Sequence, residues 1–240
     1  MKDLSDETKI KISILGDSIS TFLGYSEPEG AEFYDNEKKL LSDVVSHKDT
    51  WWGRTIEALG GELLVNNAIS GSTVCGGPRY EYPSYACSDE RTSSLGRNGV
   101  SPDVIFAYIG TNDWGRAIRI RQEEESDPAK RDPECFFLSA YELMLEKLKR
   151  NYPDAEIYCF TMAKSRFSKS STFSFPYAYR GRHIEEYVDV VRASAEKYGC
   201  RLVDLYRYAE PYETIDGFHP NRDGMLTLAD AVISIIKETI

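Results

Sequence analysis

A serine that directly follows a buried strand can act as a nucleophile, and Ser18 has this position. It comes after the apolar run 10–15, in the sequence Gly-Asp-Ser. A serine hydroxyl needs a nearby base to react near neutral pH. In isolation, such a segment more often caps a helix, and it lacks the second glycine of a G-x-S-x-G elbow. The segment alone therefore leaves both interpretations open.

One of the three histidines has the spacing of an oriented base. His219 follows Asp216 by three residues, with Gly217 between them, so one turn could bring the carboxylate to the imidazole. Such a carboxylate fixes the tautomer of the imidazole and stabilises the imidazolium. His47 lies in a polar loop and His183 lies near the start of a predicted helix, and we expect both to be solvated.

Two further strand-like runs are followed by groups that could donate a hydrogen bond to an oxyanion. Gly71 follows the run 63–69 and could offer its backbone N–H, or it could simply make a turn. Asn112 follows the run 104–109 and could offer its side-chain amide, or it could form an Asx turn. Each residue alone is ambiguous, and only their occurrence together favours an oxyanion-binding role.

Strand-length apolar runs alternate with helical patterns along the chain. The runs are 10–15, 63–69, 104–109, 157–160 and 202–205. Apolar residues at helical spacing predict helices over 50–59, 133–150 and 182–198, and another that begins at Asn221. This alternation indicates parallel βαβ units and a three-layer α/β sandwich. In a parallel sheet the site lies beyond the carboxyl ends of the strands, where the residues discussed above are found.

The whole chain is predicted to form a single domain over residues 1–240. Three segments, at about 26–48, 73–102 and 164–179, have neither the helix nor the strand period. Irregular segments of this length in a compact domain are typically functional loops.

Composition excludes several classes of protein. The 29 basic and 39 acidic residues give a formal net charge of −10, which disfavours duplex nucleic acid and anionic membranes as partners. Five cysteines with no C-x-x-C pair argue against a disulfide framework or a cysteine-based zinc site. No apolar leader and no membrane-length apolar run are visible, so we expect a cytoplasmic protein.

Taken together, four segments of the chain resemble the signature blocks of the SGNH hydrolases, which are also called GDSL esterases and lipases. The blocks are Gly-Asp-Ser at 16–18, Asn-Ala-Ile-Ser-Gly at 67–71, Gly-Thr-Asn-Asp at 110–113 and Asp-Gly-Phe-His-Pro at 216–220. A lone Gly-Asp-Ser is unspecific, whereas four blocks in order at suitable spacing are highly specific. Ile19 replaces the leucine of the family's name and touches no chemistry.

The resemblance implies a flavodoxin-like α/β/α sandwich with a five-stranded parallel sheet. It also implies that Ser18 attacks an ester carbonyl, that His219 takes the proton of Ser18, and that Asp216 orients His219. The backbone N–H groups of Ser18 and Gly71 and the side chain of Asn112 would hold the oxyanion. No metal or organic cofactor is required.

The loops are rich in aromatic side chains, which can stack on sugar rings. These are Tyr25, Tyr34, Trp51, Trp52, Tyr80, Tyr82, Tyr85, Trp114, Phe173, Phe175, Tyr177 and Tyr179. We therefore expect an esterase for short, acetyl-type esters, with O-acetylated carbohydrate as a candidate substrate. No long apolar loop is available to hold a long acyl chain. Trp51 and Trp52 open a predicted helix, and core packing of at least one is the competing interpretation.

Other polar residues near the predicted site have less specific interpretations. Asp17, Asp113 and Trp114 are candidates for substrate binding, although the two carboxylates are better interpreted as acceptors that order loops. Six arginines could place a carboxylate or phosphate near the site, but we expect most to be solvated or paired with acids. They are Arg79, Arg91, Arg97, Arg116, Arg119 and Arg121.

Related chemistries remain open because they share the acyl-enzyme. A thioesterase, a lysophospholipase or an acyltransferase would differ only in its leaving group or acceptor. A non-catalytic carbohydrate-binding module is more remote because the predicted nucleophile and base are both intact. A nucleotide-binding protein of the same fold would lack a complete G-x-G-x-x-G and would leave His219 unexplained. The expected partner is a small-molecule or carbohydrate ester, and the oligomeric state is open.

Overall fold

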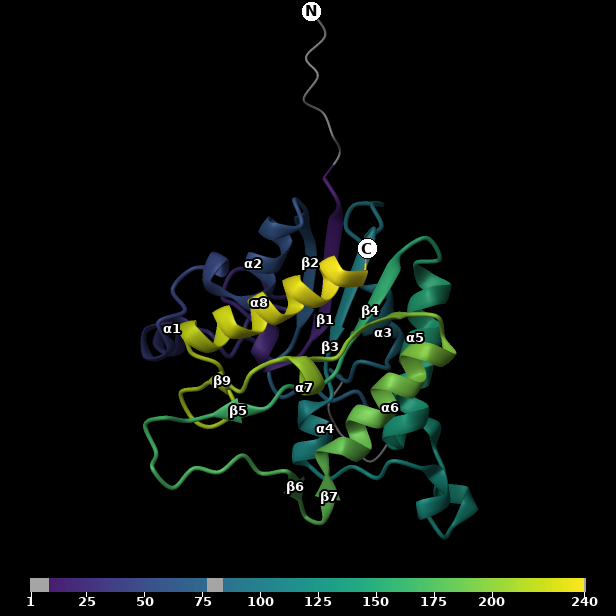
Figure 1. Cartoon of the computed structure of the whole chain (residues 1–240). Helices are drawn as coiled ribbons and strands as arrows, with labels where there is room; N and C mark the ends of the chain where they lie inside the picture. The colour runs from purple at the N-terminus through teal and green to yellow at the C-terminus, as the bar shows by residue number, and fades with distance from the viewer. Residues whose placement is uncertain (1–8, 77–83, 240) are drawn as a thin grey trace, which may run out of the picture.

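The structure is a computed structural model that describes residues 9–76 and 84–239 (Figure 1). Within these residues, five parallel strands form one sheet in the order β2-β1-β3-β4-β8. The strands are β1 (Lys11–Gly16), β2 (Glu62–Ala68), β3 (Val104–Tyr108), β4 (Glu156–Phe160) and β8 (Arg201–Val203). The chain leaves β1 for β2 on one side and then crosses to β3 on the other. The carboxyl ends of β1 and β3 therefore border the crevice at which sheets of this type bind ligands.

Helices cover both faces of the sheet, which confirms the predicted three-layer sandwich (Figure 1). The helices α2 (Trp51–Ala58) and α8 (Arg222–Thr239) pack on one face with Ile12 and Ile14 of β1. The helices α5 (Phe137–Asn151) and α6 (Ile184–Lys197) pack on the other with Leu15. Because side chains alternate along a strand, one strand supplies residues to both cores. Trp51 and Trp52 are both buried in the first core, as the competing interpretation predicted.

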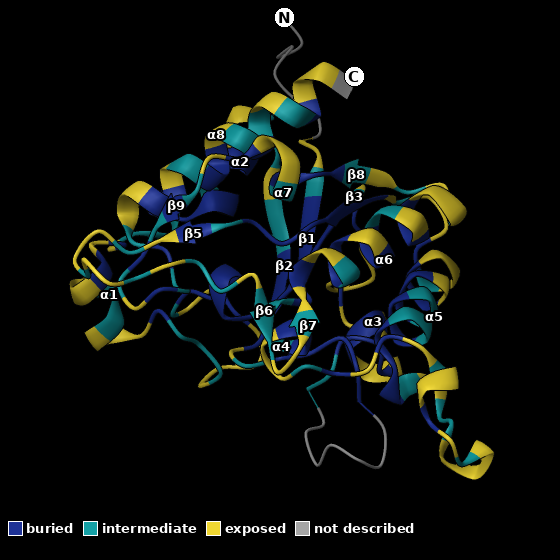
Figure 2. Ribbon diagram, turned by 60° about the horizontal axis from the view of Figure 1, so that its bottom comes forward, coloured by how far each residue is buried: buried dark blue, intermediate teal, exposed yellow. Residues whose placement is uncertain are grey.

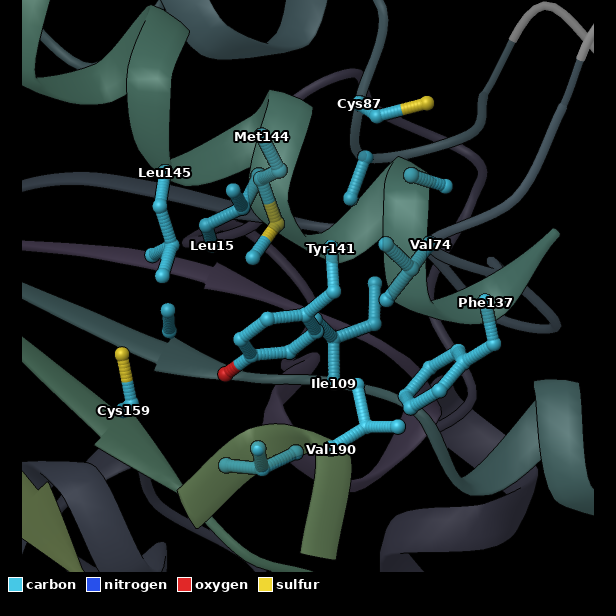
Figure 3. Close-up of a cluster of buried hydrophobic side chains, with 14 of the residues drawn as sticks. Leu15, Val74, Cys87, Ile109, Phe137, Tyr141, Met144, Leu145, Cys159 and Val190 are labelled. Carbon is cyan, nitrogen blue, oxygen red and sulfur yellow. The ribbon is translucent and has the colours of Figure 1, made fainter. Parts of the chain in front are cut away.

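The second core shows why the apolar runs and helical stripes were detectable from sequence. Figure 3 shows Tyr141, Met144 and Leu145 of α5 directed toward Leu15 of β1 and Cys159 of β4. In Figure 2 the outer faces of α5 and α6 are exposed while their inner faces are buried. This division is the one-sided apolar stripe expected of helices that cover a sheet.

Helix boundaries match the predicted ranges with one clear difference. The range 133–150 was predicted as one helix, but Pro133–Cys135 forms a separate 3-10 turn and α5 begins at Phe137. Asp132 caps the short turn by accepting a hydrogen bond from the backbone N–H of Glu134. Phe136 then has an extended backbone, which interrupts the helical pattern. A local cap and one extended residue therefore divide a segment whose apolar spacing is continuous.

Short elements that periodicity did not detect lie in the long irregular segments and between the predicted helices and strands. They are α1 (Asn36–Ser42), α3 (Asp89–Ser93), α4 (Thr111–Gly115), α7 (Leu205–Tyr208), the parallel pair β5 (Ser165–Arg166) and β9 (Tyr212–Glu213), and the hairpin β6 (Ala178–Tyr179) and β7 (Arg182–His183). Arg79, Tyr80 and Tyr82, named above among the loop residues, lie outside the described residues. In the part of the chain that is described, no helix is both long and apolar enough to cross a membrane.

Candidate active site

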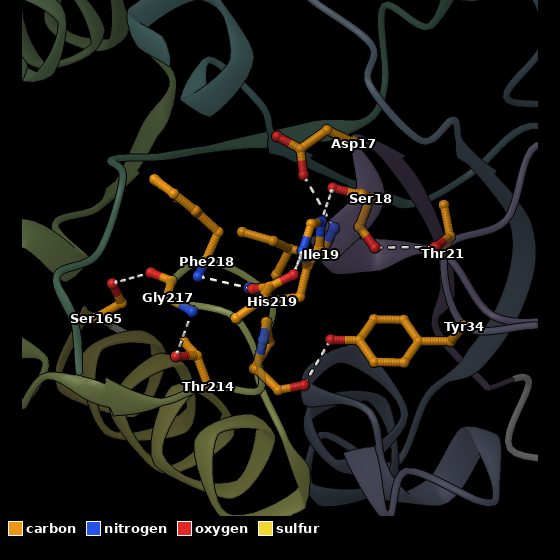
Figure 4. Close-up of polar contacts among 12 residues, drawn as sticks. Asp17, Ser18, Ile19, Thr21, Tyr34, Ser165, Thr214, Gly217, Phe218 and His219 are labelled. Carbon is orange, nitrogen blue, oxygen red and sulfur yellow. Dashed lines mark hydrogen bonds and ion pairs between the residues drawn. The ribbon is translucent and has the colours of Figure 1, made fainter. Parts of the chain in front are cut away.

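Ser18 lies where β1 ends and a short 3-10 helix begins. Asp17 precedes it in an extended conformation and accepts a hydrogen bond from the backbone N–H of Ile19, with Asp17 Oδ1 and the nitrogen 3.1 Å apart. The hydroxyl of Thr21 donates to the carbonyl of Ser18 at 2.9 Å and closes the turn. Ser18 is therefore held on a rigid turn at the carboxyl edge of the sheet (Figure 4).

His219 contacts both Ser18 and Asp216. Its Nε2 lies 3.0 Å from Ser18 Oγ, and its Nδ1 lies 2.7 Å from Asp216 Oδ2. Asp216 Oδ1 accepts hydrogen bonds from the backbone N–H groups of Phe218 and His219, at 2.9 and 2.8 Å. Partial burial opposes ionisation of this carboxyl, but the hydrogen bonds from His219 outweigh it and lower the pKa of Asp216 to about 2. Asp216 is therefore a carboxylate at neutral pH.

The turn that brings Asp216 to His219 depends on Gly217. Its φ of 98° lies in the region that favours glycine. The N–H of Gly217 donates to Thr214 Oγ1 at 3.0 Å, and its carbonyl accepts from Ser165 Oγ at 2.7 Å. Figure 4 shows Ser165 and Thr214 on either side of this turn. The three-residue spacing noted in the sequence thus corresponds to a fixed local geometry.

Gly71 lies in the loop that follows β2, and Asn112 contacts this loop. Asn112 is in α4, directly after β3, and its Nδ2 donates to the carbonyl of Ser72 at 2.9 Å. Gly71 has a φ of 75°, and its carbonyl accepts from Arg116 Nη2 at 2.9 Å. The side-chain amide of Asn112 is therefore already oriented by one of its two N–H groups. The sequence did not predict this contact.

A cleft of about 360 Å³ opens at Ser18, Asn112 and His219. Arg116, Tyr179 and Phe218 complete its polar and aromatic walls. Gly71 is not among the residues that line this cleft, and its contact with the lining is the hydrogen bond that its carbonyl accepts from Arg116.

Trp114 lies behind the wall of the cleft that Tyr179 forms. It is only 1% exposed. Its ring centroid lies 4.8 Å from that of Tyr179, and its Nε1 donates to the carbonyl of Arg182 at 3.3 Å. Trp114 therefore supports the hairpin β6–β7 from inside.

Arg91 differs from the solvated or ion-paired arginines that we expected. It is only 3% exposed, and its guanidinium donates to the carbonyls of Gly16 and Asn67 at 3.1 and 2.6 Å and to Ser72 Oγ at 2.8 Å. Burial lowers the pKa of Arg91 to about 9. One side chain thus joins the end of β1, the end of β2 and the loop that contains Gly71. Its position in a segment without helix or strand periodicity offered no signal of this role.

Asp17 and Asp113 are buried beneath the cleft. Asp113 accepts the backbone N–H groups of Val74 and Cys75 at 2.8 and 3.0 Å, which orders the loop after β2. Burial is the main cause that raises the pKa of Asp17 to about 7 and that of Asp113 to about 6. These contacts suit the interpretation of both residues as acceptors that order loops.

We expect Asp17→Asn to stabilise the protein at pH 8 and to weaken its dependence on pH. The folded pKa of Asp17, about 7, lies above the ordinary value of 3.8, so the folded state binds more protons between these pH values. The free energy of unfolding must therefore fall as pH rises through this window, by an upper limit of roughly 4 kcal/mol. Asparagine retains the acceptor for Ile19 without the buried charge.

The measurement is urea unfolding of wild type and variant from pH 4 to pH 8. The matched control is Asp230→Asn, which removes one exposed negative charge on α8. If Asp17→Asn and wild type lose stability equally between pH 4 and pH 7, burial of Asp17 does not control this dependence.

Comparison with known proteins gives matches over most of the chain. The family model described as GDSL-like Lipase/Acylhydrolase matches residues 10–176, more than half of the sequence. A structure from Bacteroides uniformis assigned to the GDSL-like lipases is 29% identical, with a TM-score of 0.71 over 99% of this chain and 100% of that chain. One from Bacteroides ovatus, with the same assignment, is 27% identical, with a TM-score of 0.71 over 97% and 100% of the two chains.

More distant matches concern the fold alone. A carbohydrate acetylesterase from Sinorhizobium meliloti is 13% identical, with a TM-score of 0.63 over 97% of this chain and 100% of that chain. A search of the curated proteins found no match. Among the described residues, no three His, Cys, Asp or Glu side chains are grouped so that they could hold a metal ion.

Proposed function

The chain belongs to the GDSL-like lipase/acylhydrolase family, and on that premise we propose that it is a serine esterase for short-chain, acetyl-type esters. The observation that carries the proposal is the pair of contacts made by His219, which lies 3.0 Å from Ser18 Oγ and 2.7 Å from Asp216 Oδ2. This arrangement allows the imidazole to accept a proton from a serine while an ionised carboxylate stabilises the resulting cation.

In the proposed reaction, Ser18 Oγ attacks the ester carbonyl while its proton moves to Nε2 of His219. The carbonyl oxygen becomes an oxyanion, which the N–H groups of Ser18, Gly71 and Asn112 stabilise. His219 then gives its proton to the leaving alcohol as the C–O bond breaks, and an acyl-Ser18 ester remains. Water loses a proton to His219 as it attacks this ester, and the acid leaves as Ser18 regains its proton.

The cleft favours a small acyl group attached to a polar or ring-shaped alcohol. Tyr179 and Phe218 supply aromatic surface beside Ser18, and Asn112 and Arg116 supply hydrogen-bond donors. Aromatic faces and fixed polar groups together suit a sugar ring, so O-acetylated carbohydrate is the substrate class that we propose. The Sinorhizobium protein named above, a carbohydrate acetylesterase, shares the fold.

We expect nitrophenyl acetate and butyrate to be hydrolysed at least about tenfold faster than esters of eight or more carbons. The cleft has a volume of about 360 Å³ and must hold both the acyl group and the alcohol of the ester. It therefore leaves little room for a long acyl chain. The measurement is kcat/KM over a chain-length series, together with acetate release from acetylated xylan and acetylated monosaccharides.

Ser18→Ala provides the background for every substrate in this panel. A preference for long chains would overturn the short-acyl proposal. Faster cleavage of acyl thioesters, or acyl transfer to an added alcohol in preference to water, would assign the site to a thioesterase or an acyltransferase.

A further inference from the structure

Phe33 stacks directly on the imidazole of His219. The two ring centroids lie 3.5 Å apart and the ring planes differ by only 10°. This separation is shorter than the 4.5–7 Å typical of aromatic pairs. Phe33 comes from the long segment 26–48, which has neither the helix nor the strand period. The contact therefore connects an irregular loop to the predicted base.

The two hydrogen bonds of His219 leave one direction of movement unrestrained. Both bonds, to Ser18 Oγ and to Asp216 Oδ2, involve ring nitrogens and therefore act in the plane of the imidazole. They do little to resist tilting or displacement perpendicular to that plane. The flat ring of Phe33 occupies that side, so it complements the two hydrogen bonds.

Phe33 is itself held by contacts to both sides of the site. Its backbone N–H donates to Thr21 Oγ1 at 2.9 Å, and Thr21 donates in turn to the carbonyl of Ser18. The neighbouring Tyr34 is fully buried, and its hydroxyl donates to the carbonyl of Pro220 at 2.6 Å (Figure 4). The segment thus contacts the turn of Ser18 and the loop of His219, and it sets the position of the stacked ring relative to both.

The stack also has an electrostatic consequence. When the Ser18 Oγ–H bond breaks and the proton binds Nε2, His219 becomes a cation. The face of an aromatic ring carries negative charge density and attracts a cation held against it. Phe33 would therefore stabilise protonated His219 more than neutral His219. Because the cation forms only during the reaction, this stabilisation raises kcat and does not raise the affinity for substrate.

We propose that Phe33 is a positioning residue that holds the His219 imidazole in plane and stabilises its protonated form during catalysis. The inference rests on the proposed serine-esterase function. It assigns a role to the segment 26–48, which none of the four signature blocks includes.

The test is steady-state kinetics of Phe33→Leu and Phe33→Tyr with a short-chain ester. Leucine retains apolar bulk without a ring face, so we expect kcat to fall roughly 5- to 30-fold while KM changes less than about twofold. Tyrosine retains the face and should keep kcat within about twofold of wild type. A purely structural role would instead lower the melting temperature or raise KM in parallel with the fall in kcat.

Tyr25→Leu is a matched control because it removes a similar stack elsewhere. The Tyr25 ring lies 4.3 Å from that of His47, with the planes 25° apart. We expect this variant to retain wild-type kcat.

If Phe33→Leu fails to fold, the test uses ring-fluorinated phenylalanine at position 33 in place of leucine. Fluorination weakens the negative face with little change of shape, so kcat should fall as fluorines are added.

Two different failures are distinguishable. If wild type shows no Ser18-dependent turnover of any ester, the proposed function fails. If wild type is active and a folded Phe33→Leu variant, or the fluorinated series, keeps wild-type kcat, the proposed function stands and the role of Phe33 is overturned.

Discussion

Ser18→Ala should abolish covalent labelling by a fluorophosphonate probe and should lower ester hydrolysis by roughly 10⁴-fold or more. The probe and the substrate both require an oxygen that can form a bond to phosphorus or to the acyl carbon, and alanine has none. Ser18 is 7% exposed, and its hydroxyl lies 3.0 Å from His219 Nε2. The side chain is thus placed for this reaction rather than for solvation. The measurements are labelling followed by mass spectrometry, and kcat/KM with nitrophenyl acetate.

Ser70→Ala is the appropriate control for this prediction. Ser70 is exposed in the loop next to Gly71, so it is a nearby serine that a probe could reach. The backbone N–H of Ser70 donates a hydrogen bond to the carbonyl of Ala31. Alanine at position 70 retains this backbone contact. We expect labelling and turnover close to wild type. Undiminished activity in Ser18→Ala, or a probe adduct on Ser70, would disprove the assignment of Ser18 as the nucleophile.

The elements of the sheet could be predicted because their signal is local and strong. The apolar run 104–109 became β3 within one residue, since a strand buried on both faces must be apolar throughout. The run 202–205 was less accurate, because β8 ends at Val203 and Asp204 caps the short helix α7, which begins at Leu205. The division before α5 was missed for a similar reason. A single capping side chain can decide an element boundary without changing the apolar pattern.

The site could be predicted only where its residues lie at the ends of predicted elements. Ser18 and Asn112 follow strands, and the spacing of Asp216 and His219 requires only one turn. Phe33 and Arg91 carry no such signal. Phe33 reaches His219 across most of the chain, and Arg91 reaches the end of β1 by folding back over the loop after β2. Contacts between irregular segments depend on the complete fold, so neither residue type nor local spacing could identify them.

Asp216→Asn should lower kcat by roughly 10⁴-fold while leaving the protein folded. Asn Oδ1 can still accept the backbone N–H groups of Phe218 and His219. The NH₂ group would then face Nδ1 of His219, so Nδ1 must become the acceptor and the ring proton must move to Nε2. An imidazole in that tautomer cannot accept the proton of Ser18. Because the Asp216 side chain is 42% exposed, weakening its contact with His219 should cost only about 1 kcal/mol of stability.

This prediction separates an orienting carboxylate from a residue that merely shapes the turn. If Asp216 only shaped the turn, asparagine would preserve its backbone contacts and turnover would stay close to wild type. If it fixes the tautomer, turnover falls while the melting temperature changes little, and the ¹⁵N shifts of the His219 ring exchange their protonated and unprotonated positions. The control is Asp223→Asn, an exposed carboxylate in the first turn of α8, which should leave both the kinetics and the shifts unchanged. Unchanged kinetics in Asp216→Asn would mean that another group orients His219.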